Sequence, residues 1–383
     1  MTSPADTPVL LCARDACLLG TAASHVVAAP LDALGAQVAL HLGTLAPHAR
    51  LAGALPFDRM AHSHLLAVRA QTDRVAVDAW LQSQSGGESA PAWTLTPEPT
   101  RDFYEDSVAR CVRLLARGPA LRKVVLARSL HALADRAINP WWLARRLGAD
   151  PHVLRYVVPL PVDADAPPAW LVGATPERLL ARRGASVLSE PLAGSAPRLP
   201  DAAASQAQAD ALLTSAKDQQ EHRYVVQAIG DLLAPLCRQL RVPTQPSLHA
   251  TATMWHLGTR IEGALKDASA DNLAQTSSAA LAALLHPTPA VGGAPRAQAV
   301  RAIAELEPVP RGYYAGAVGW CDAQGDGDWH VALRCARVQG RTARLFAGAG
   351  IVADSDPAAE GAETRAKFSA MLHALGADSD ALL

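Results

Sequence analysis

The chain has 383 residues, half of them apolar, and a formal net charge of −1 at pH 7, so it can bury a large core but offers no basic face for nucleic acid. No apolar run approaches the ~18 residues of a membrane helix, and the first residues lack the pattern of a signal peptide. The six cysteines are irregularly spaced, which favours reduced, packed thiols in the cytoplasm over disulfides or zinc.

Residues 1–100 give the weakest signals, because short apolar runs alternate there with alanine-rich segments. Residues 100–118 have apolar side chains at helical spacing, which predicts an amphipathic helix packed on the core. A β-branched strand follows over 122–128, with Lys123 near its start. A lysine that flanks a buried strand usually lies at the surface. The alternative is a buried base with a lowered pKa.

Two further strands end in tight turns that present polar groups. The strand predicted over 169–172 runs into the turn GATPE, which fixes the carboxylate of Glu177. The strand predicted over 187–189 runs into a glycine turn that ends at Ser195. Neighbouring strands that end in this way commonly form a pocket.

Residues 202–240 are predicted to form a long helix, which carries Asp218 and Glu221 three positions apart and therefore on one face. His256 follows in the segment WHLGT, where a histidine taken alone is more often a satisfied core residue. Farther on, an apolar strand is predicted over 329–337 and contains Arg334. A buried arginine needs an anionic partner, which is either a protein or a substrate carboxylate.

The segment 345–368 is the most informative part of the chain. Its glycine run, which includes Gly350, lets the backbone approach another group closely because glycine has no Cβ. The sequence Asp-Ser-Asp-Pro then predicts a helix start. The helix places Glu360, Glu363 and Lys367 on one face. The alternative interpretation is a solvated face with an ordinary Glu363–Lys367 ion pair.

Two helices therefore each present a pair of carboxylates one turn apart. Mg²⁺ prefers oxygen ligands in near-octahedral geometry and keeps several waters, so one or two direct carboxylates suit it. Neither pair has the His or Cys spacing of a zinc site. The pattern favours a hard cation or an acid–base site.

Taken in chain order, these motifs resemble those of the chorismate-utilising enzymes, and specifically of the isochorismate synthases. The resemblance runs from about residue 53 to about residue 375 and does not cover the extreme N-terminus. Any one motif would be weak, but the ordered set is specific. The matching segments are GALPFD, KVVLAR, GATPERLL, EPLAGSAPR, KDQQEH, WHLGT, LLHPTPAVGG, AELEP, GAVGWCD, VALRCA, LFAGAGIVADSDPAAE and ETRAKF.

The resemblance implies a role for each candidate residue. Lys123 matches the base that activates water, and Glu177 matches the general acid. Four carboxylates match the family's Mg²⁺ site, the first two as direct ligands and the others behind them: Glu221, Glu363, Asp218 and Glu360. Seven residues match the substrate pocket, among them contacts to a substrate carboxylate: Ser195, His256, Thr259, Tyr314, Arg334, Gly350 and Lys367.

The implied fold is α+β, a layered α/β sandwich of two large facing antiparallel sheets flanked by helices. We expect one large domain over 1–383, in which 101–383 is the chorismate-binding core and 1–100 is weakly matched. We also expect a monomer whose partner is the small molecule chorismate. Gly361 departs from the family, which often has a bulky residue there, and weakens its helix by ~1 kcal/mol relative to alanine.

The implied activity is Mg²⁺-dependent isomerisation of chorismate to isochorismate, by attack of water at ring carbon 2 and loss of the 4-hydroxyl. The product would feed siderophore, menaquinone or salicylate-type biosynthesis. A salicylate synthase, which also eliminates pyruvate, shares these residues, but the HPTPA loop favours simple isomerisation. Enzymes of the family that use ammonia lack a lysine at the position that corresponds to Lys123. A non-catalytic chorismate-binding subunit is the alternative of another class, and the retained catalytic and metal-site residues argue against it.

Overall fold

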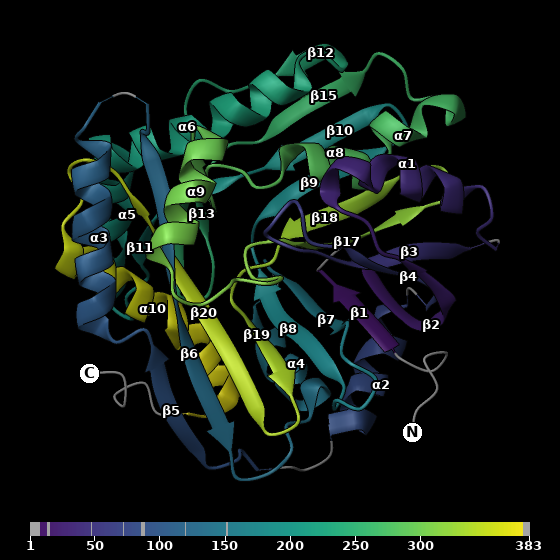
Figure 1. Cartoon of the computed structure of the whole chain (residues 1–383), viewed down its shortest axis with the longest axis horizontal. Helices are drawn as coiled ribbons and strands as arrows, with labels where there is room; N and C mark the ends of the chain where they lie inside the picture. The colour runs from purple at the N-terminus through teal and green to yellow at the C-terminus, as the bar shows by residue number, and fades with distance from the viewer. Residues whose placement is uncertain are drawn as a thin grey trace.

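Seventeen strands form one antiparallel sheet in the computed structural model, which describes residues 8–13, 16–46, 48–71, 73–85, 89–118, 120–150 and 152–377. Their pairing is continuous, in the order β12–β15–β10–β9–β18–β17–β3–β4–β2–β1–β7–β8–β19–β20–β6, and β6 then pairs with both β5 and β16 (Figure 1). The strands are β1 Pro8–Cys12, β2 Cys17–Val27, β3 Ala49–Leu55, β4 His64–Gln71, β5 Trp93–Glu98, β6 Lys123–Ala134, β7 Leu154–Leu160, β8 Ala169–Thr175, β9 Arg178–Arg183, β10 Ser186–Glu190, β12 Cys237–Arg241, β15 Ile261–Leu265, β16 Gly293–Ala294, β17 Ala317–Asp322, β18 Gly327–Val331, β19 Cys335–Gln339 and β20 Thr342–Ile351.

A second, three-stranded sheet has the order β11–β14–β13 and packs against α5 and α6. Its strands are β11 Leu192–Pro197, β13 Ser247–Ala250 and β14 Met254–Gly258. The α-helices are α1 Leu31–Leu42, α2 Arg74–Ser85, α3 Arg101–Leu115, α4 Pro140–Arg146, α5 Ala202–Thr214, α6 Ala216–Leu233, α7 Leu273–Thr276, α8 Ser278–Leu285, α9 Arg296–Leu306 and α10 Pro357–Leu375. Within the described ranges, none of these helices has the length and apolar character needed to cross a membrane.

The main hydrophobic core lies between strands that are far apart in the pairing order of the seventeen-stranded sheet, called the ladder below. It joins Val124 and Leu126 of β6 to Leu51 of β3 and Ile261 of β15, all of them fully or almost fully buried. The two facing sheets of the expected α+β sandwich are therefore halves of one curved ladder. Strands β1–β4 lie in the middle of that ladder, between β17 and β7.

A second core covers the opposite face of strands such as β7. Because side chains alternate along a strand, Val157 of β7 points to this core, whereas Tyr156 and Val158 point to the main core. Trp142 of α4 and Phe368 and Met371 of α10 also belong to the second core. Helix α10 thereby packs on β20 and on α3 (Figure 1). The expected cap is confirmed, because the Asp356 side chain accepts the backbone N–H of Ala359 at 2.8 Å and Pro357 opens the helix.

Residues 101–115 form the helix predicted within 100–118, but two other predictions need correction. Residues 202–240 are two helices and a strand, because Ser215 stops α5 and caps α6 by accepting the N–H of Asp218. The predicted strand 329–337 is interrupted, because Arg334 has φ = 46° and separates β18 from β19.

The expectation that all cysteines are reduced is wrong for one pair. Cys12 and Cys17 face each other across the β1–β2 hairpin and form a disulfide. The hairpin register brings them together, which the irregular spacing did not reveal. The other cysteines are free and buried, as expected: Cys111, Cys237, Cys321 and Cys335.

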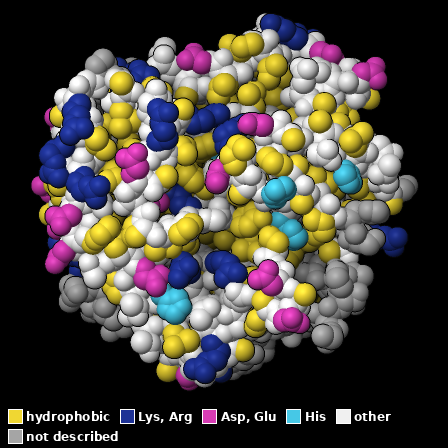
Figure 2. Space-filling model, viewed as in Figure 1, with side chains coloured by type: hydrophobic (Ala, Val, Ile, Leu, Met, Phe, Trp, Pro, Cys, Tyr) yellow, Lys and Arg dark blue, Asp and Glu magenta, His cyan; other side chains and the backbone are white. Residues whose placement is uncertain are grey.

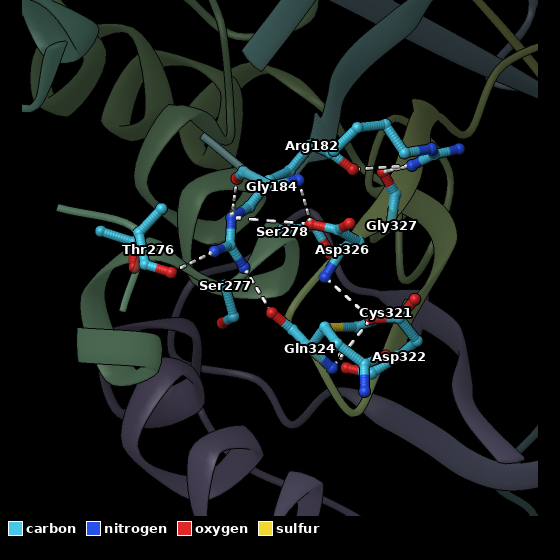
Figure 3. Close-up of polar contacts among 12 residues, drawn as sticks. Arg182, Gly184, Thr276, Ser277, Ser278, Cys321, Asp322, Gln324, Asp326 and Gly327 are labelled. Atoms are coloured by element: carbon cyan, nitrogen blue, oxygen red, sulfur yellow. Dashed lines mark hydrogen bonds and ion pairs between the residues drawn. The ribbon is translucent and has the colours of Figure 1, made fainter. Parts of the chain in front are cut away.

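Arg182, in β9, forms hydrogen bonds with three loops (Figure 3). Its guanidinium is buried and donates to the carbonyls of Gly184, Gln324 and Ala268 at 3.0, 2.9 and 3.1 Å. These carbonyls come from the β9–β10 turn, the β17–β18 turn and the segment after β15. Buried acceptors that lose their donor cost ~1–3 kcal/mol each.

We therefore expect Arg182→Met to lower the free energy of unfolding by about 3 kcal/mol, measured from urea unfolding followed by circular dichroism. Arg110→Met changes an exposed arginine on α3 and is the matched control, with an expected change within about 0.5 kcal/mol. Equal urea midpoints for the two variants would contradict the role given to Arg182.

Candidate active site

A narrow cavity of about 100 Å³ lies where β6, β20, β11, α6 and α10 meet. Figure 2 shows that the molecule is hollowed near the middle of the face drawn there, with basic and hydrophobic side chains around the hollow. Nine predicted residues line the cavity: Glu177, Ser195, Glu221, His256, Tyr314, Arg334, Gly350, Glu363 and Lys367. The other four do not line it: Lys123, Asp218, Thr259 and Glu360.

Glu177 is the buried acid of the cavity. The loop between β8 and β9 holds it, and its side chain is among the least accessible polar groups, with the residue 3% exposed. Burial raises the pKa of Glu177 to about 8, although the backbone N–H of Leu192 and the cations of Lys123 and Lys367 oppose the rise. The carboxyl group is therefore mostly protonated at neutral pH.

Lys123 is completely buried, with 0% of its side chain exposed. It is the first residue of β6, and its Nζ lies 2.9 Å from Oε1 of Glu221. Nζ makes no hydrogen bond of good geometry with any described residue. Lys123 therefore lies beside Glu221, which lines the cavity, and does not line the cavity itself. The surface position that residue statistics favoured is wrong, because β6 is a central strand covered on both faces.

The acidic cluster consists of Asp218, Glu221, Glu360 and Glu363, and each of its three glutamates forms an ion pair with a lysine. Besides the Lys123–Glu221 pair, Lys367 Nζ lies 2.6 Å from Glu363 Oε1, to which Ser195 Oγ also donates at 3.2 Å. Lys217 Nζ donates to Glu360 Oε1 at 2.6 Å. This last pair joins α6 to α10, which are distant in sequence.

Two glycines allow the carboxylates to come close to the backbone. A Cβ added at Gly350 would lie 2.1 Å from Oε1 of Glu221, and one at Gly194 would lie 3.1 Å from Oδ1 of Asp218. The first distance is far inside van der Waals contact, so residue 350 has to be glycine while Glu221 keeps this position. The expectation that the glycine run approaches another group is confirmed.

The acidic cluster fits a hard cation by its chemistry. All four donors are carboxylates, which Mg²⁺ prefers, and Oε2 of buried Glu360 makes no hydrogen bond among the described residues. Burial raises the pKa of Glu360, with a further rise from Glu363, and burial also raises the pKa of Asp218. A bound cation would relieve both rises. The three glutamates are turned toward lysines, and the described carboxylates do not converge as a ready-made site.

Arg334 is a partly buried cation that forms no ion pair with any described carboxylate. Its Nη2 lies 2.7 Å from Nε2 of His256, and Nη1 donates to Oγ1 of Thr251 at 3.3 Å. Burial lowers the pKa of Arg334 to about 10. Burial and Arg334 together hold the pKa of His256 well below its usual range, so His256 accepts from the guanidinium in its neutral form. A guanidinium without a carboxylate suits an anionic ligand.

Apolar groups form the rest of the wall, and the sequence analysis did not single them out. Phe346 stacks on Tyr314 with ring centroids 4.8 Å apart and planes at 9°. Gly348 and Phe346 lie two and four positions before Gly350, so strand periodicity would have placed them on the same face. Lys217 and Thr251 were also missed, because their partners are remote in sequence.

Thr259 lies beside the site, where its hydroxyl is 2.7 Å from Nε2 of His222. Gly361 faces α3, because a Cβ there would lie 3.0 Å from Oε1 of Glu105. The carbonyl of Gly361 accepts from Arg128 Nη2 at 3.3 Å. The small residue therefore allows close packing of α10 on α3, and both carboxylates of α10 keep their positions.

The chain is similar to known proteins in both sequence and fold. Residues 53–376 match the family described as "Chorismate binding enzyme". Isochorismate synthase DhbC of Bacillus subtilis is 41% identical over 331 residues, which is 85% of this chain and 80% of the relative. Isochorismate synthase EntC of Escherichia coli is 40% identical over 329 residues, with 85% and 81% covered. The crystal structure of DhbC from Bacillus anthracis is 35% identical, covers 98% of both chains and has a TM-score of 0.88.

Proposed function

The chain belongs to the chorismate-binding enzyme family, and we propose that it is an isochorismate synthase whose acid and base are Glu177 and Lys123. The observation that carries this assignment of roles is the raised pKa of Glu177 at the cavity. A neutral carboxylic acid can give a proton to a leaving hydroxyl, which a carboxylate cannot.

The reaction exchanges one hydroxyl for another on the chorismate ring. A water oxygen forms a bond to carbon 2, the ring double bonds shift, and the bond from carbon 4 to its hydroxyl breaks. Glu177 gives its proton to that hydroxyl, which leaves as water. Lys123 acts in its neutral form and takes the proton that the attacking water loses. Proton exchange with solvent then restores both groups.

Chorismate carries two carboxylates, and the cavity offers a separate place for each. Arg334, which forms no ion pair with a described carboxylate, supports binding of one. Lys367 and the backbone at Gly350 support binding of the ring carboxylate beside the acidic cluster. The stacked side chains of Tyr314 and Phe346 would together form the wall against the chorismate ring.

We propose Mg²⁺ as the cation of the acidic cluster. Glu221 and Glu363 would hold it directly, with Asp218 and Glu360 behind them. The ion would supply positive charge at the ring carboxylate. The orphaned Oε2 of Glu360 and the all-oxygen donor set support this proposal.

The test is incubation of the purified protein with chorismate, with Mg²⁺ or with a chelator, followed by chromatography of the products. We expect isochorismate in equilibrium with chorismate, and loss of turnover by at least about 100-fold in chelator. Salicylate with pyruvate would assign the pyruvate-eliminating reaction instead. Chorismate binding without turnover would assign a binding subunit. Full activity in chelator would remove the Mg²⁺ proposal.

The names of the relatives include 2,3-dihydroxybenzoate-specific and menaquinone-specific enzymes. Isochorismate from this chain would accordingly feed siderophore-type or menaquinone biosynthesis.

A further inference from the structure

One lysine of the acidic cluster has no role in the proposed reaction. Lys123 and Lys367 serve as base and carboxylate contact, but Lys217 lies outside the cavity and pairs with Glu360, which is also outside it. The cluster as a whole has four carboxylates, and Asp218 has no ion pair among the described residues. Lys217 therefore contributes charge to the cluster without facing the substrate.

The pair spans two helices. Lys217 stands in the first turn of α6, and Glu360 stands in the first turn of α10. The Glu360 side chain is 1% exposed and has only the Lys217 ammonium as an ionic partner in the described part of the chain. Without that ammonium, buried Glu360 would face Glu363 one turn away with no compensating charge. Such a buried, unpaired carboxylate is strongly destabilising.

Lys217 differs from the other two lysines in its access to the surface. Its side chain is 37% exposed, and it lines an outer cavity of about 410 Å³. The same cavity contains Gln220 and the carboxylate-bearing Asp354. The flexible lysine side chain can therefore turn from Glu360 into this cavity and keep its ammonium hydrated.

We propose that Lys217 is a resident counter-ion, which neutralises Glu360 while the cluster is free of metal and turns into the outer cavity when a divalent cation binds. The inference rests on the proposed Mg²⁺ site. An ammonium 2.6 Å from Glu360 repels a second cation beside Glu363, so the lysine weakens metal binding while it stabilises the metal-free protein. Mg²⁺ binding is then an exchange of one cation for another.

The test is Lys217→Met, compared with wild type by calorimetric titration with Mg²⁺ alone and by thermal unfolding in chelator and in excess Mg²⁺. We expect Mg²⁺ to bind about fivefold more tightly to the variant. We also expect a lower Tm in chelator and a larger rise of Tm on addition of Mg²⁺. Lys266→Met is the matched control, because Lys266 is exposed and donates only to the carbonyl of Pro235. It should leave both quantities unchanged.

A positioning role for Lys217 predicts the opposite sign. If the lysine held Glu360 in place for the metal, Lys217→Met would weaken Mg²⁺ binding, and that result overturns the proposal. Equal Mg²⁺ affinities for variant and wild type also overturn it, while the proposed function stands. Wild type that binds no Mg²⁺ overturns the metal proposal together with this one.

A double-mutant cycle covers the case in which Lys217→Met is too unstable to titrate. Glu360→Gln removes the charge that Lys217 neutralises, so the Tm cost of Lys217→Met in chelator should disappear in the double variant. A cost of the same size in both backgrounds would mean that Lys217 stabilises the fold through contacts other than this pair.

Discussion

Replacement of Glu177 by glutamine is expected to lower kcat by about 10²- to 10⁴-fold, because the amide keeps the shape of the acid but has no proton to give to the leaving hydroxyl. KM for chorismate should change little, since Arg334 and Lys367 remain in place. The measurement is steady-state formation of isochorismate. Glu262→Gln, at a half-exposed glutamate on β15, is the control and should keep full activity.

The pH dependence gives an independent check on the same residue. With a pKa of about 8, Glu177 is protonated below that pH, so kcat/KM of wild type should fall as the pH rises through about 8. The stability of the fold changes with pH in the same direction. Between about pH 4.5, the usual pKa of a glutamate, and pH 8 the unfolded chain releases a proton that the folded chain retains, so stability falls as the pH rises. The Glu177→Gln substitution removes this loss of stability.

Glu177→Gln should therefore have a higher Tm than wild type at pH 9, whereas at pH 4 the two should be nearly equal. A variant with near-full activity at neutral pH would exclude Glu177 as the acid. A variant that is inactive and also less stable at every pH would show that Glu177 supports the structure and not the chemistry.

Replacement of Lys123 by alanine is expected to lower kcat by about 10²- to 10⁴-fold, because the attacking water loses its proton acceptor. The truncation leaves a small space next to Glu221. Added ethylamine should enter it and restore part of the activity, with a rate that increases with the concentration of free amine. The measurement is isochorismate formation at several amine concentrations, with Glu177→Gln as the control that amines cannot restore.

Removal of Lys123 also leaves Glu221 without its ion pair. Thermal unfolding of Lys123→Ala in chelator and in Mg²⁺ therefore accompanies the assay, since loss of fold would mimic loss of catalysis. A folded Lys123→Ala protein with near-wild-type turnover would exclude Lys123 as the base.

Local patterns predicted the elements that depend on local interactions. The helix predicted within 100–118 spans Arg101–Leu115, and the helix start predicted after the glycine run has its cap at Asp356, because the apolar period and the flanking residues are sufficient. The break at Arg334 was missed, since φ = 46° at a non-glycine residue depends on contacts with Thr251 and His256. His256 is in β14 and Thr251 in the β13–β14 connection, so these partners leave no signal in the sequence near Arg334.

Most of the candidate site residues could be named from the sequence, but not how they are arranged. The acid-x-x-acid spacing placed Asp218 and Glu221 on one helix face, yet the Lys217–Glu360 pair joins residues 143 positions apart. Burial of Lys123 likewise depends on the strands on either side of β6. The resemblance indicated that Lys123 is the base, whereas residue statistics favoured a surface position.

The order of strands in the ladder has a consequence for synthesis of the chain. Strand β3, near the start, finds one of its neighbours only in β17, so its edge at residues 50–55 has no partner until residues 317–322 have left the ribosome. Fragments that end before that point expose an unpaired, apolar strand edge, which favours association with other chains. Nascent chains of this protein should therefore depend on chaperones until nearly the whole polypeptide has been made.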